Sequence, residues 1–157
     1  MVRQRELCAV DGAVVVLQCA DSACREAVVD FCGIQRGAEV ARHFASADLF
    51  LFPSHSETFG NTTLEAMASG IAAVAFDYGA AREHLRHGID GMAVDNDADF
   101  IAAATKLATD DALRHAMGER ARHSMQRLHP EQVASDFDTL LAGLADTRRR
   151  HASAAVA

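Results

Sequence analysis

The sequence has little positive charge, a single lysine and no tryptophan. Its 15 lysine and arginine residues are outnumbered by 22 acidic residues, so the formal net charge is −7. Because a surface that binds nucleic acid is usually basic, this balance argues against a general nucleic-acid-binding function. It does not exclude one bound nucleotide, since backbone amides and one or two arginines can hold a phosphate. The single lysine is Lys106, far along the chain.

Long apolar runs are absent as well, although 50% of the residues are hydrophobic. No run reaches the roughly 18 to 20 apolar residues that a transmembrane helix needs. The polar residues 1–6 are not followed by the apolar core of a secretory signal. The three arginines at 148–150 are too few for a polybasic membrane signal. We therefore expect a cytoplasmic protein, and peripheral contact with the inner face of the membrane stays open.

Metal-binding patterns are also missing from the sequence. The four cysteines form no Cys-x-x-Cys pair, and no histidine cluster has zinc-finger spacing. We expect reduced, partly buried thiols and no zinc site. The cysteines are Cys8, Cys19, Cys24 and Cys32.

Short apolar runs alternate with helical patterns along most of the chain, after residues 1–12, which are polar and read as irregular. This alternation is typical of parallel βαβ units. The predicted fold is therefore α/β, a Rossmann-like parallel sheet with helices on both faces and a helical C-terminal third. We expect one domain over residues 1–147 and a frayed, basic and alanine-rich tail over residues 148–157. Strands are expected at 13–17, 29–32, 48–52, 71–76 and 92–94, and helices at 22–28, 38–46, 61–69, 80–86 and three times in the last third, the last from near Pro130.

The stretch from residue 52 to residue 70 has the features of a ligand site. In an open parallel sheet, ligands bind beyond the carboxyl ends of the strands, and this loop follows an expected strand. Asn61 is a favourable N-cap for the next helix, and Gly60 would let an anion approach the backbone amides of residues 60–63. Glu57 and Glu65 lie on either side of the turn and could accept hydrogen bonds from sugar hydroxyls. Their spacing alone favours a simpler interpretation, two solvent-exposed carboxylates.

A family resemblance changes that balance. From about residue 33 to about residue 144, the chain resembles the C-terminal half of a retaining glycosyltransferase of the GT-B fold, family four, also called group 1. Glu57 and Glu65 match the two ends of the family's motif of glutamate, seven residues and glutamate. The residues that carry the resemblance are 45–54, 57–61 and 63–70, followed by Gly79, Glu83, Gly88 and Gly91.

The resemblance implies a hexosyltransferase-like enzyme that binds a nucleotide-diphosphate sugar, UDP- or GDP-linked. It implies transfer of the sugar to an acceptor hydroxyl with retention of configuration, without a bound metal or other cofactor. Glu57 would contact the donor sugar and is the catalytic candidate, and Glu65 would contact the ribose. The other donor-binding candidates are Phe59, Gly60, Asn61 and Thr62 at the sugar or diphosphate, and Ile34, within residues 33–35, near the base.

Parts of the family pattern are not found in the sequence. The acceptor domain that comes first in the family is missing, and so are the arginine and lysine that neutralise the diphosphate. Residues 18–22 lack the glycine of the family's turn, so residues 1–30 form a divergent or incomplete start. We therefore expect a truncated chain with weak or no activity alone. Its partner would be the nucleotide-sugar donor, with a separate acceptor-domain chain or a homo-oligomer left open.

Other interpretations stay open. The alternative is a non-enzymatic nucleotide-sugar-binding or partner module of the same fold, and a third is an unrelated nucleotide-binding α/β domain. His55, in the motif loop, could contact a ligand, although a solvated histidine is the simpler interpretation. Arg82 or Arg86 could reach an anionic ligand, although solvated arginines are the simpler interpretation. The apolar stripe over residues 133–144 would pack on a missing domain, fold onto the sheet or remain exposed.

Overall fold

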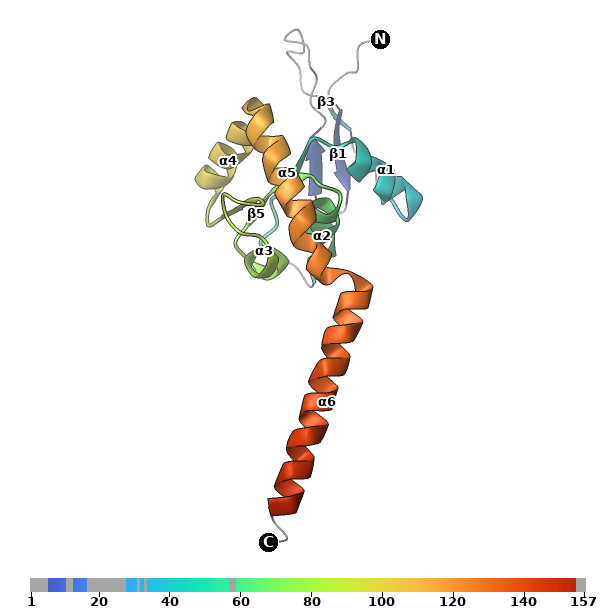
Figure 1. The fold of residues 1–157 in the computed structure, drawn as a ribbon. Helices are drawn as coiled ribbons and strands as arrows, with labels where there is room; N and C mark the ends of the chain where they lie inside the picture. Colours follow the sequence, from blue (N-terminus) through green and yellow to red (C-terminus); the bar gives the residue numbers. More distant parts are fainter. Residues whose placement is uncertain are drawn as a thin grey trace. The chain divides into compact units, whose positions relative to one another are not determined.

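The computed structural model describes residues 6–10, 13–16, 28–30, 32, 34–56 and 59–154, with side chains described between residues 32 and 148. Contacts between residues divide the chain into two units, Met1–Ser124 and Met125–Ala157. Figure 1 shows the order of the elements along the chain. We describe each unit by itself.

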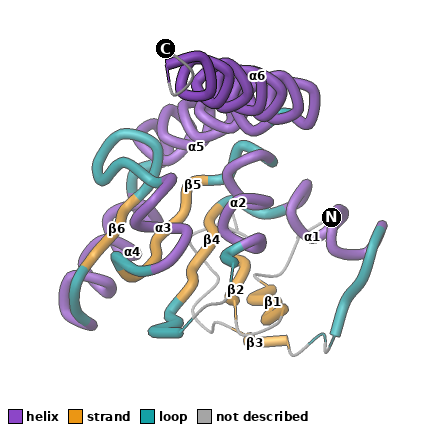
Figure 2. Tube along the Cα trace, turned by 90° about the horizontal axis from the view of Figure 1, so that it is seen from below, coloured by secondary structure: helices purple, strands orange, loops and turns teal. Residues whose placement is uncertain are grey.

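The first unit is built on a six-stranded sheet with the order β3-β1-β2-β4-β5-β6, which can be followed in Figure 2. β4, β5 and β6 are parallel to one another, and β1 is parallel to β3. β2 runs antiparallel to both of its neighbours. Five strands therefore share one direction, and their carboxyl ends lie along one edge of the sheet, which we call the carboxyl edge. The strands are β1 (Glu6–Val10), β2 (Ala13–Val16), β3 (Val28–Asp30), β4 (Leu49–Phe52), β5 (Ala72–Phe76) and β6 (Met92–Val94).

The prediction that residues 1–12 are irregular is wrong for Glu6–Val10, which form β1. Only Asp11 and Gly12 separate β1 from β2, and Val10 is paired with Ala13. A two-residue connection joins antiparallel strands, and Asp-Gly is a favoured sequence for it. The same connection explains why β2 departs from the parallel direction expected for the sheet. The predicted helix at residues 22–28 lies outside the described residues, except that Val28 begins β3.

In the described part of the first unit, five helices accompany the sheet, and the predicted positions of most of them are confirmed. The helix expected at residues 38–46 is α1, and that expected at 61–69 is α2, one residue shorter. One detail of α2 was predicted wrongly: the N-cap is Gly60 rather than Asn61, which is the first helical residue. Gly60 takes this place because its backbone is left-handed, with φ of 73°, a conformation that glycine adopts without strain. The helices are α1 (Ala38–Ser46), α2 (Asn61–Ala68), α3 (Gly79–His84), α4 (Asp97–Thr109) and α5 (Asp111–Met125).

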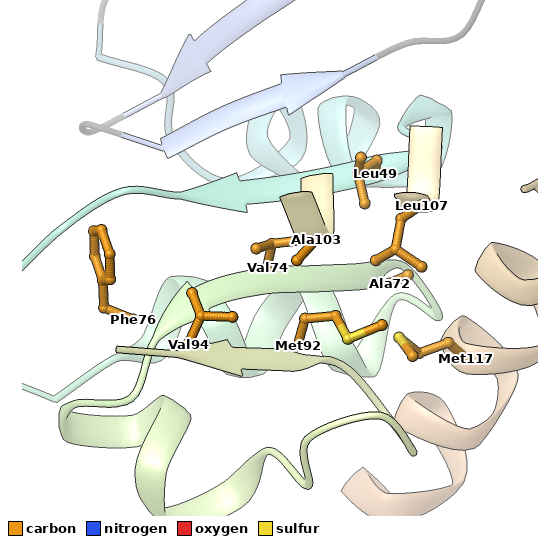
Figure 3. Close-up of a cluster of buried hydrophobic side chains, with 9 residues drawn as sticks. All are labelled: Leu49, Ala72, Val74, Phe76, Met92, Val94, Ala103, Leu107 and Met117. Carbon is orange, nitrogen blue, oxygen red and sulfur yellow. The ribbon is translucent and has the colours of Figure 1, made fainter. Parts of the chain in front are cut away.

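The core lies on both faces of β5, whose five residues are all buried. Successive side chains of a strand point to opposite faces. Ala72, Val74 and Phe76 form one cluster with Ala103 and Leu107 of α4, as Figure 3 shows. The alternate residues of β5 face the other side, where α2 and α3 pack against the strand. Helices therefore cover both faces, as the sequence predicted.

α5 fixes the turns that precede β5 and β6. Its Arg122 Nη2 donates to the carbonyl oxygen of Ser69 at 3.0 Å, and Arg120 Nε donates to the carbonyl oxygen of Ile89 at 2.6 Å. Gly118 packs so closely that an added Cβ would lie 2.2 Å from the carbonyl oxygen of Gly70. α5 thus holds the end of α2 in place at the edge of the sheet opposite to the carboxyl edge.

Asp90, which is fully buried, is the centre of a second link to α5. Its carboxylate accepts hydrogen bonds from the backbone N–H of Arg86 at 2.6 Å, from Arg86 Nε at 2.7 Å and from Ser124 Oγ at 2.7 Å. Burial by itself would raise the pKa of Asp90. The hydrogen bonds from Ser124 and Arg86, together with the guanidinium charge, outweigh it and lower the pKa below the ordinary value.

The expectation of four reduced thiols is wrong for Cys32, which is disulfide-bonded. A disulfide requires two Cα atoms about 5.5 Å apart, so the pairing depends on the folded chain and cannot be read from cysteine spacing.

The second unit consists of a short 3-10 helix, η1 (Gln126–Leu128), and α6 (Pro130–Ala154). α6 continues through residues 148–154, where the sequence analysis places a frayed tail. Its residues 130–148 are all exposed. None of the helices in the described parts of the chain combines the length and the apolar composition that crossing a lipid bilayer requires.

Candidate functional site

The candidate site lies where connections leave the carboxyl edge of the sheet. The segment after β3 leads through Gln35 to the start of α1, and the connection after β4 leads to the start of α2. Because β3 and β4 point in the same direction, both connections emerge at this edge. In open α/β sheets this edge is where ligands bind.

The start of α2 presents backbone N–H groups without a side-chain cap. Gly60 is buried and left-handed, and the N–H of Leu64 makes the first helical hydrogen bond, 3.2 Å to the carbonyl oxygen of Gly60. The N–H groups before Leu64 have no partner within the helix and carry the positive end of its dipole. Asn61 is exposed and Thr62 is half-buried, so the predicted anion-binding turn is accessible.

A cleft of about 570 Å³ lies between α1 and α2. Thr62 and Glu65 line it from α2, and Gln35 and Arg36 line it from the connection before α1. α1 itself contributes apolar side chains, among them Phe44. The side chain of Gln35 donates to the carbonyl oxygen of Cys32, so this hydrogen bond stays within the connection between β3 and α1. The structure therefore brings Glu65 together with the segment that the sequence analysis placed near a base.

Four of the described predicted residues do not line this cleft: Ile34, Phe59, Gly60 and Asn61. Phe59 is 79% exposed and Ile34 is 71% exposed, and Ile34 adjoins Gln35, which lines the cleft. Glu57, the catalytic candidate, lies outside the described residues, as does Thr58. The role of Glu57 stays a prediction.

Arg36 is a residue that the sequence analysis missed. Among the described residues that line the cleft, it carries the one positive charge. The signal available in the sequence was its position, directly after the residues placed near the base. Nothing in the spacing showed that it lines the same cleft as Glu65, because the two residues are 29 positions apart.

The cations that the sequence analysis considered lie elsewhere. Lys106 lines a separate cleft of about 610 Å³ beside β6 and α4, with His87 and Asp99. Arg82 Nε lies 3.4 Å from Asp77 Oδ1, and Arg86 is bound to Asp90. The lysine therefore does not line the cleft between α1 and α2.

His55 lies at the carboxyl edge, where its ring stacks on Phe76 with centroids 3.9 Å apart. Its Nε2 is 3.9 Å from Asp97 Oδ1, although both side chains are largely exposed. Phe76 is the last residue of β5, so His55, three residues after the end of β4, lies against the carboxyl end of β5. Within the described ranges, no three His, Cys, Asp or Glu side chains are grouped so that they could hold a metal ion.

Residues 11–110 match the sequence profile of the family described as "Glycosyl transferases group 1", more than half of the chain. The chain is 36% identical over 104 residues to N-acetyl-alpha-D-glucosaminyl L-malate synthase of Bacillus anthracis, covering 64% of this chain and 27% of that protein. It is also 36% identical over 95 residues to the GDP-mannose-dependent alpha-mannosyltransferase of Mycolicibacterium smegmatis, covering 60% of this chain and 24% of that enzyme. The chain thus spans about a quarter of the length of these relatives.

Solved structures show the same fold. Sucrose-phosphate synthase of Thermosynechococcus elongatus superimposes with a TM-score of 0.65 at 27% identity, over 76% of this chain and 31% of that one. The C-terminal domain of a group 1 glycosyl transferase, LpcC of Francisella tularensis, gives a TM-score of 0.57 at 25% identity, over 66% of this chain and 54% of that one. Anabaena HepE, solved with UDP and glucose, gives a TM-score of 0.61 at 23% identity, over 73% of this chain and 32% of that one. Profile, relatives and fold agree, and the chain belongs to the group 1 glycosyl transferases of the GT-B fold.

Proposed function

We propose that this chain is the donor-binding domain of a retaining glycosyltransferase that transfers a sugar from a nucleotide-diphosphate sugar to an acceptor hydroxyl. The observation that carries the proposal is the cleft between α1 and α2. It places a carboxylate, Glu65, opposite a polar connection and beside the uncapped start of a helix. A nucleoside diphosphate offers complementary groups: a ribose diol, a base and two phosphates. Relatives that use such donors support the proposal.

Glu65 is the ribose-binding residue in this proposal. Its carboxylate is exposed on α2 and lines the cleft, where both oxygens can accept hydrogen bonds from neighbouring hydroxyls. The base would lie toward Gln35 and Arg36, with the apolar side of α1 behind it. Ile34, which adjoins Gln35, would contact the base from the rim.

The diphosphate would lie at the start of α2. The free N–H groups of residues 61–63 and the left-handed Gly60 suit an anion that approaches the backbone closely. Arg36 would add the positive charge that the family usually obtains from an arginine and a lysine. Negative charge develops on the diphosphate as the bond to the sugar breaks, so these groups would stabilise the leaving group. Glu57 and Phe59 would contact the sugar on the far side of the phosphates.

We further propose that no metal ion or other cofactor takes part, because the helix amides and Arg36 can meet the diphosphate charge. The chain would act in the cytoplasm. A competing function, a non-enzymatic nucleotide-sugar-binding module, is favoured by one observation: Arg36 is the single cation among the described residues that line the cleft.

The experiment is a calorimetric titration of the chain with UDP- and GDP-linked sugars, with and without EDTA. Glu65→Gln keeps the size of the side chain and removes its charge. We expect this substitution to weaken binding roughly tenfold or more, since hydrogen bonds to charged groups contribute about 1.5 to 3 kcal/mol. EDTA should leave binding unchanged.

Glu119→Gln is the matched control, because Glu119 is an exposed glutamate on α5 outside the cleft. It should bind like the unsubstituted chain. If no nucleotide sugar binds, or if both substitutions weaken binding equally, the proposed donor site is wrong. Binding without transfer to any acceptor, even when an acceptor domain is supplied, would favour the non-enzymatic module.

A further inference from the structure

His55 contacts two other elements at the carboxyl edge of the sheet. Its ring stacks on Phe76, the last residue of β5, with the ring planes 20° apart. Phe76 also packs on Phe100 of α4, with ring centroids 5.2 Å apart. The Nε2 atom of His55 is 3.9 Å from Oδ1 of Asp97, the first residue of α4. The connection that follows β4 is therefore held against the end of β5 and the start of α4.

The backbone on either side of His55 is also restrained. The ring of Pro53 fixes its φ angle. Ser54 Oγ donates to the carbonyl oxygen of Ser56 at 2.7 Å, and the backbone N–H of Ser56 points back to the same Oγ, with an N···O distance of 3.4 Å. His55 is thus the middle residue of a small turn whose ends are linked. Because such a turn moves as a unit, the contact of the His55 ring helps to set where the connection lies.

The contacts of His55 are weak compared with those of the core. The side chains of His55 and Asp97 are 71% and 86% exposed, so their ion pair lies in solvent and contributes little. The stack on Phe76 is the stronger contact, because Phe76 is buried and belongs to the core cluster. The fold of the first unit therefore does not depend on His55. The ring instead supplies a fixed point for an exposed connection.

We propose that His55 is a positioning residue for the sugar side of the donor site. The inference rests on the proposed function, in which the connection between β4 and α2 contacts the sugar and Glu65 contacts the ribose. His55 belongs to that connection and does not line the cleft between α1 and α2. A connection that is already held in one place loses less conformational entropy when a sugar binds to it. His55 therefore strengthens recognition of the sugar and leaves recognition of the nucleoside diphosphate unchanged.

A comparison of two kinds of ligand tests this role. Calorimetric titration of the full chain with UDP and GDP reports on the nucleoside diphosphate alone. Titration with UDP-glucose, UDP-N-acetylglucosamine and GDP-mannose reports on the same groups plus a sugar. His55→Ala should raise the Kd for the nucleotide sugar by roughly threefold to tenfold, the range expected for the loss of one aromatic contact. The Kd for the corresponding nucleoside diphosphate should stay within about twofold of the unsubstituted value.

Two further substitutions separate the ring of His55 from its ion pair. His55→Phe keeps an aromatic ring on Phe76 and removes Nε2, so it should bind the nucleotide sugar within about twofold of the unsubstituted chain. Asp97→Asn removes the same ion pair from the other partner and should have an equally small effect. The matched control is His123→Ala, since His123 is an exposed histidine on α5 that does not line the cleft. It should change neither dissociation constant.

Three results would overturn the inference. His55→Ala weakens binding of the nucleoside diphosphate and the nucleotide sugar equally, as a loss of folded protein would, or it changes neither. A His55→Phe variant that binds the nucleotide sugar as weakly as His55→Ala would also contradict it, because the ring would then not position the connection. If one of these results accompanies nucleotide binding that Glu65→Gln weakens, the proposed function stands and only the role of His55 is wrong. If the unsubstituted chain binds none of these ligands, both are wrong.

Discussion

Two carboxylates of the first unit show how burial decides what a side chain can do. Glu65 is exposed and lines the cleft, so its oxygens are available to a ligand. Asp90 is fully buried, and Arg86 and Ser124 occupy its oxygens with hydrogen bonds. The first is a candidate for binding, and the second stabilises the fold.

We expect Asp90→Asn to lower the free energy of unfolding by about 2 kcal/mol at pH 7, because charge-assisted hydrogen bonds from Arg86 are lost. The folded-state pKa of Asp90 is lowered, so its stabilisation is present above the unfolded pKa of about 3.9 and is lost as pH falls through the folded value. The difference between variant and unsubstituted chain should therefore shrink in acid. Urea unfolding at several pH values measures it.

Asp95→Asn is the control for this experiment, since Asp95 is exposed just after β6. It should change the free energy of unfolding by less than about 0.5 kcal/mol. An Asp90→Asn variant whose stability loss is as large at pH 2.5 as at pH 7, values on the two sides of roughly 3.9, would contradict the role given to the charge.

Among the elements, α5 packs closely against the backbone of the turn before β5. An added Cβ on Gly118 would lie 2.2 Å from the carbonyl oxygen of Gly70, which is backbone and cannot rotate away. Gly118→Ala should therefore push α5 from the turn before β5 and lower the free energy of unfolding by about 1 to 3 kcal/mol. Thermal or urea unfolding of the variant and of the unsubstituted chain measures the loss of stability.

Gly143→Ala makes the same chemical change on α6, where no atom lies within 4 Å of the added carbon. The alanine should leave stability unchanged or raise it by roughly 0.5 to 1 kcal/mol, since glycine is a poor helix former. Equal effects of the two substitutions would show that the contact between α5 and Gly70 is unimportant.

Most elements of the first unit could be predicted because their evidence is local. The bounds of α1 and β6 follow from side-chain periodicity and flanking glycines within ten or so residues. β1 was not predicted in this way, because its strand state depends on pairing with β2 and β3. Similarly, Asn61 is a favourable cap by residue type, but the left-handed backbone of Gly60 shifts the helix start by one position.

Only part of the candidate site could be predicted from the sequence. Glu65 and the segment near Gln35 were named from family resemblance, and the structure brings them to one cleft. Arg36 was missed because it shares a cleft with Glu65 only when β3 and β4 point the same way. That orientation depends on strands distant in sequence, which local patterns do not report.

At the scale of the whole molecule, we expect this chain alone to transfer sugar poorly. One cation lines the described cleft, and the resemblance implies that catalysis needs a second, facing domain. Transfer from a nucleotide sugar to an added acceptor should be detected only slightly above the rate without protein. A radiolabelled-donor assay measures it.

Adding a separately produced acceptor domain from a related group 1 enzyme is the informative second arm of this assay. An increase in transfer that Glu65→Gln abolishes would support the role of the chain as a donor-binding half. Rapid turnover by the chain alone would refute the expectation, since it would mean that α2 amides and Arg36 suffice for the leaving group.

The packing of α2 has a consequence for the thermodynamics of recognition. Ala66 and Met67 are fully buried, and Gly118 and Arg122 of α5 hold the turn after the helix. The backbone that presents Glu65 is thus already ordered before any nucleotide arrives. Binding at this side of the cleft would lose little conformational entropy, so the hydrogen bonds that we propose to the ribose would appear almost fully in the affinity. In this respect the side of the cleft formed by α2 is preorganised by contacts at the edge of the sheet opposite to the carboxyl edge.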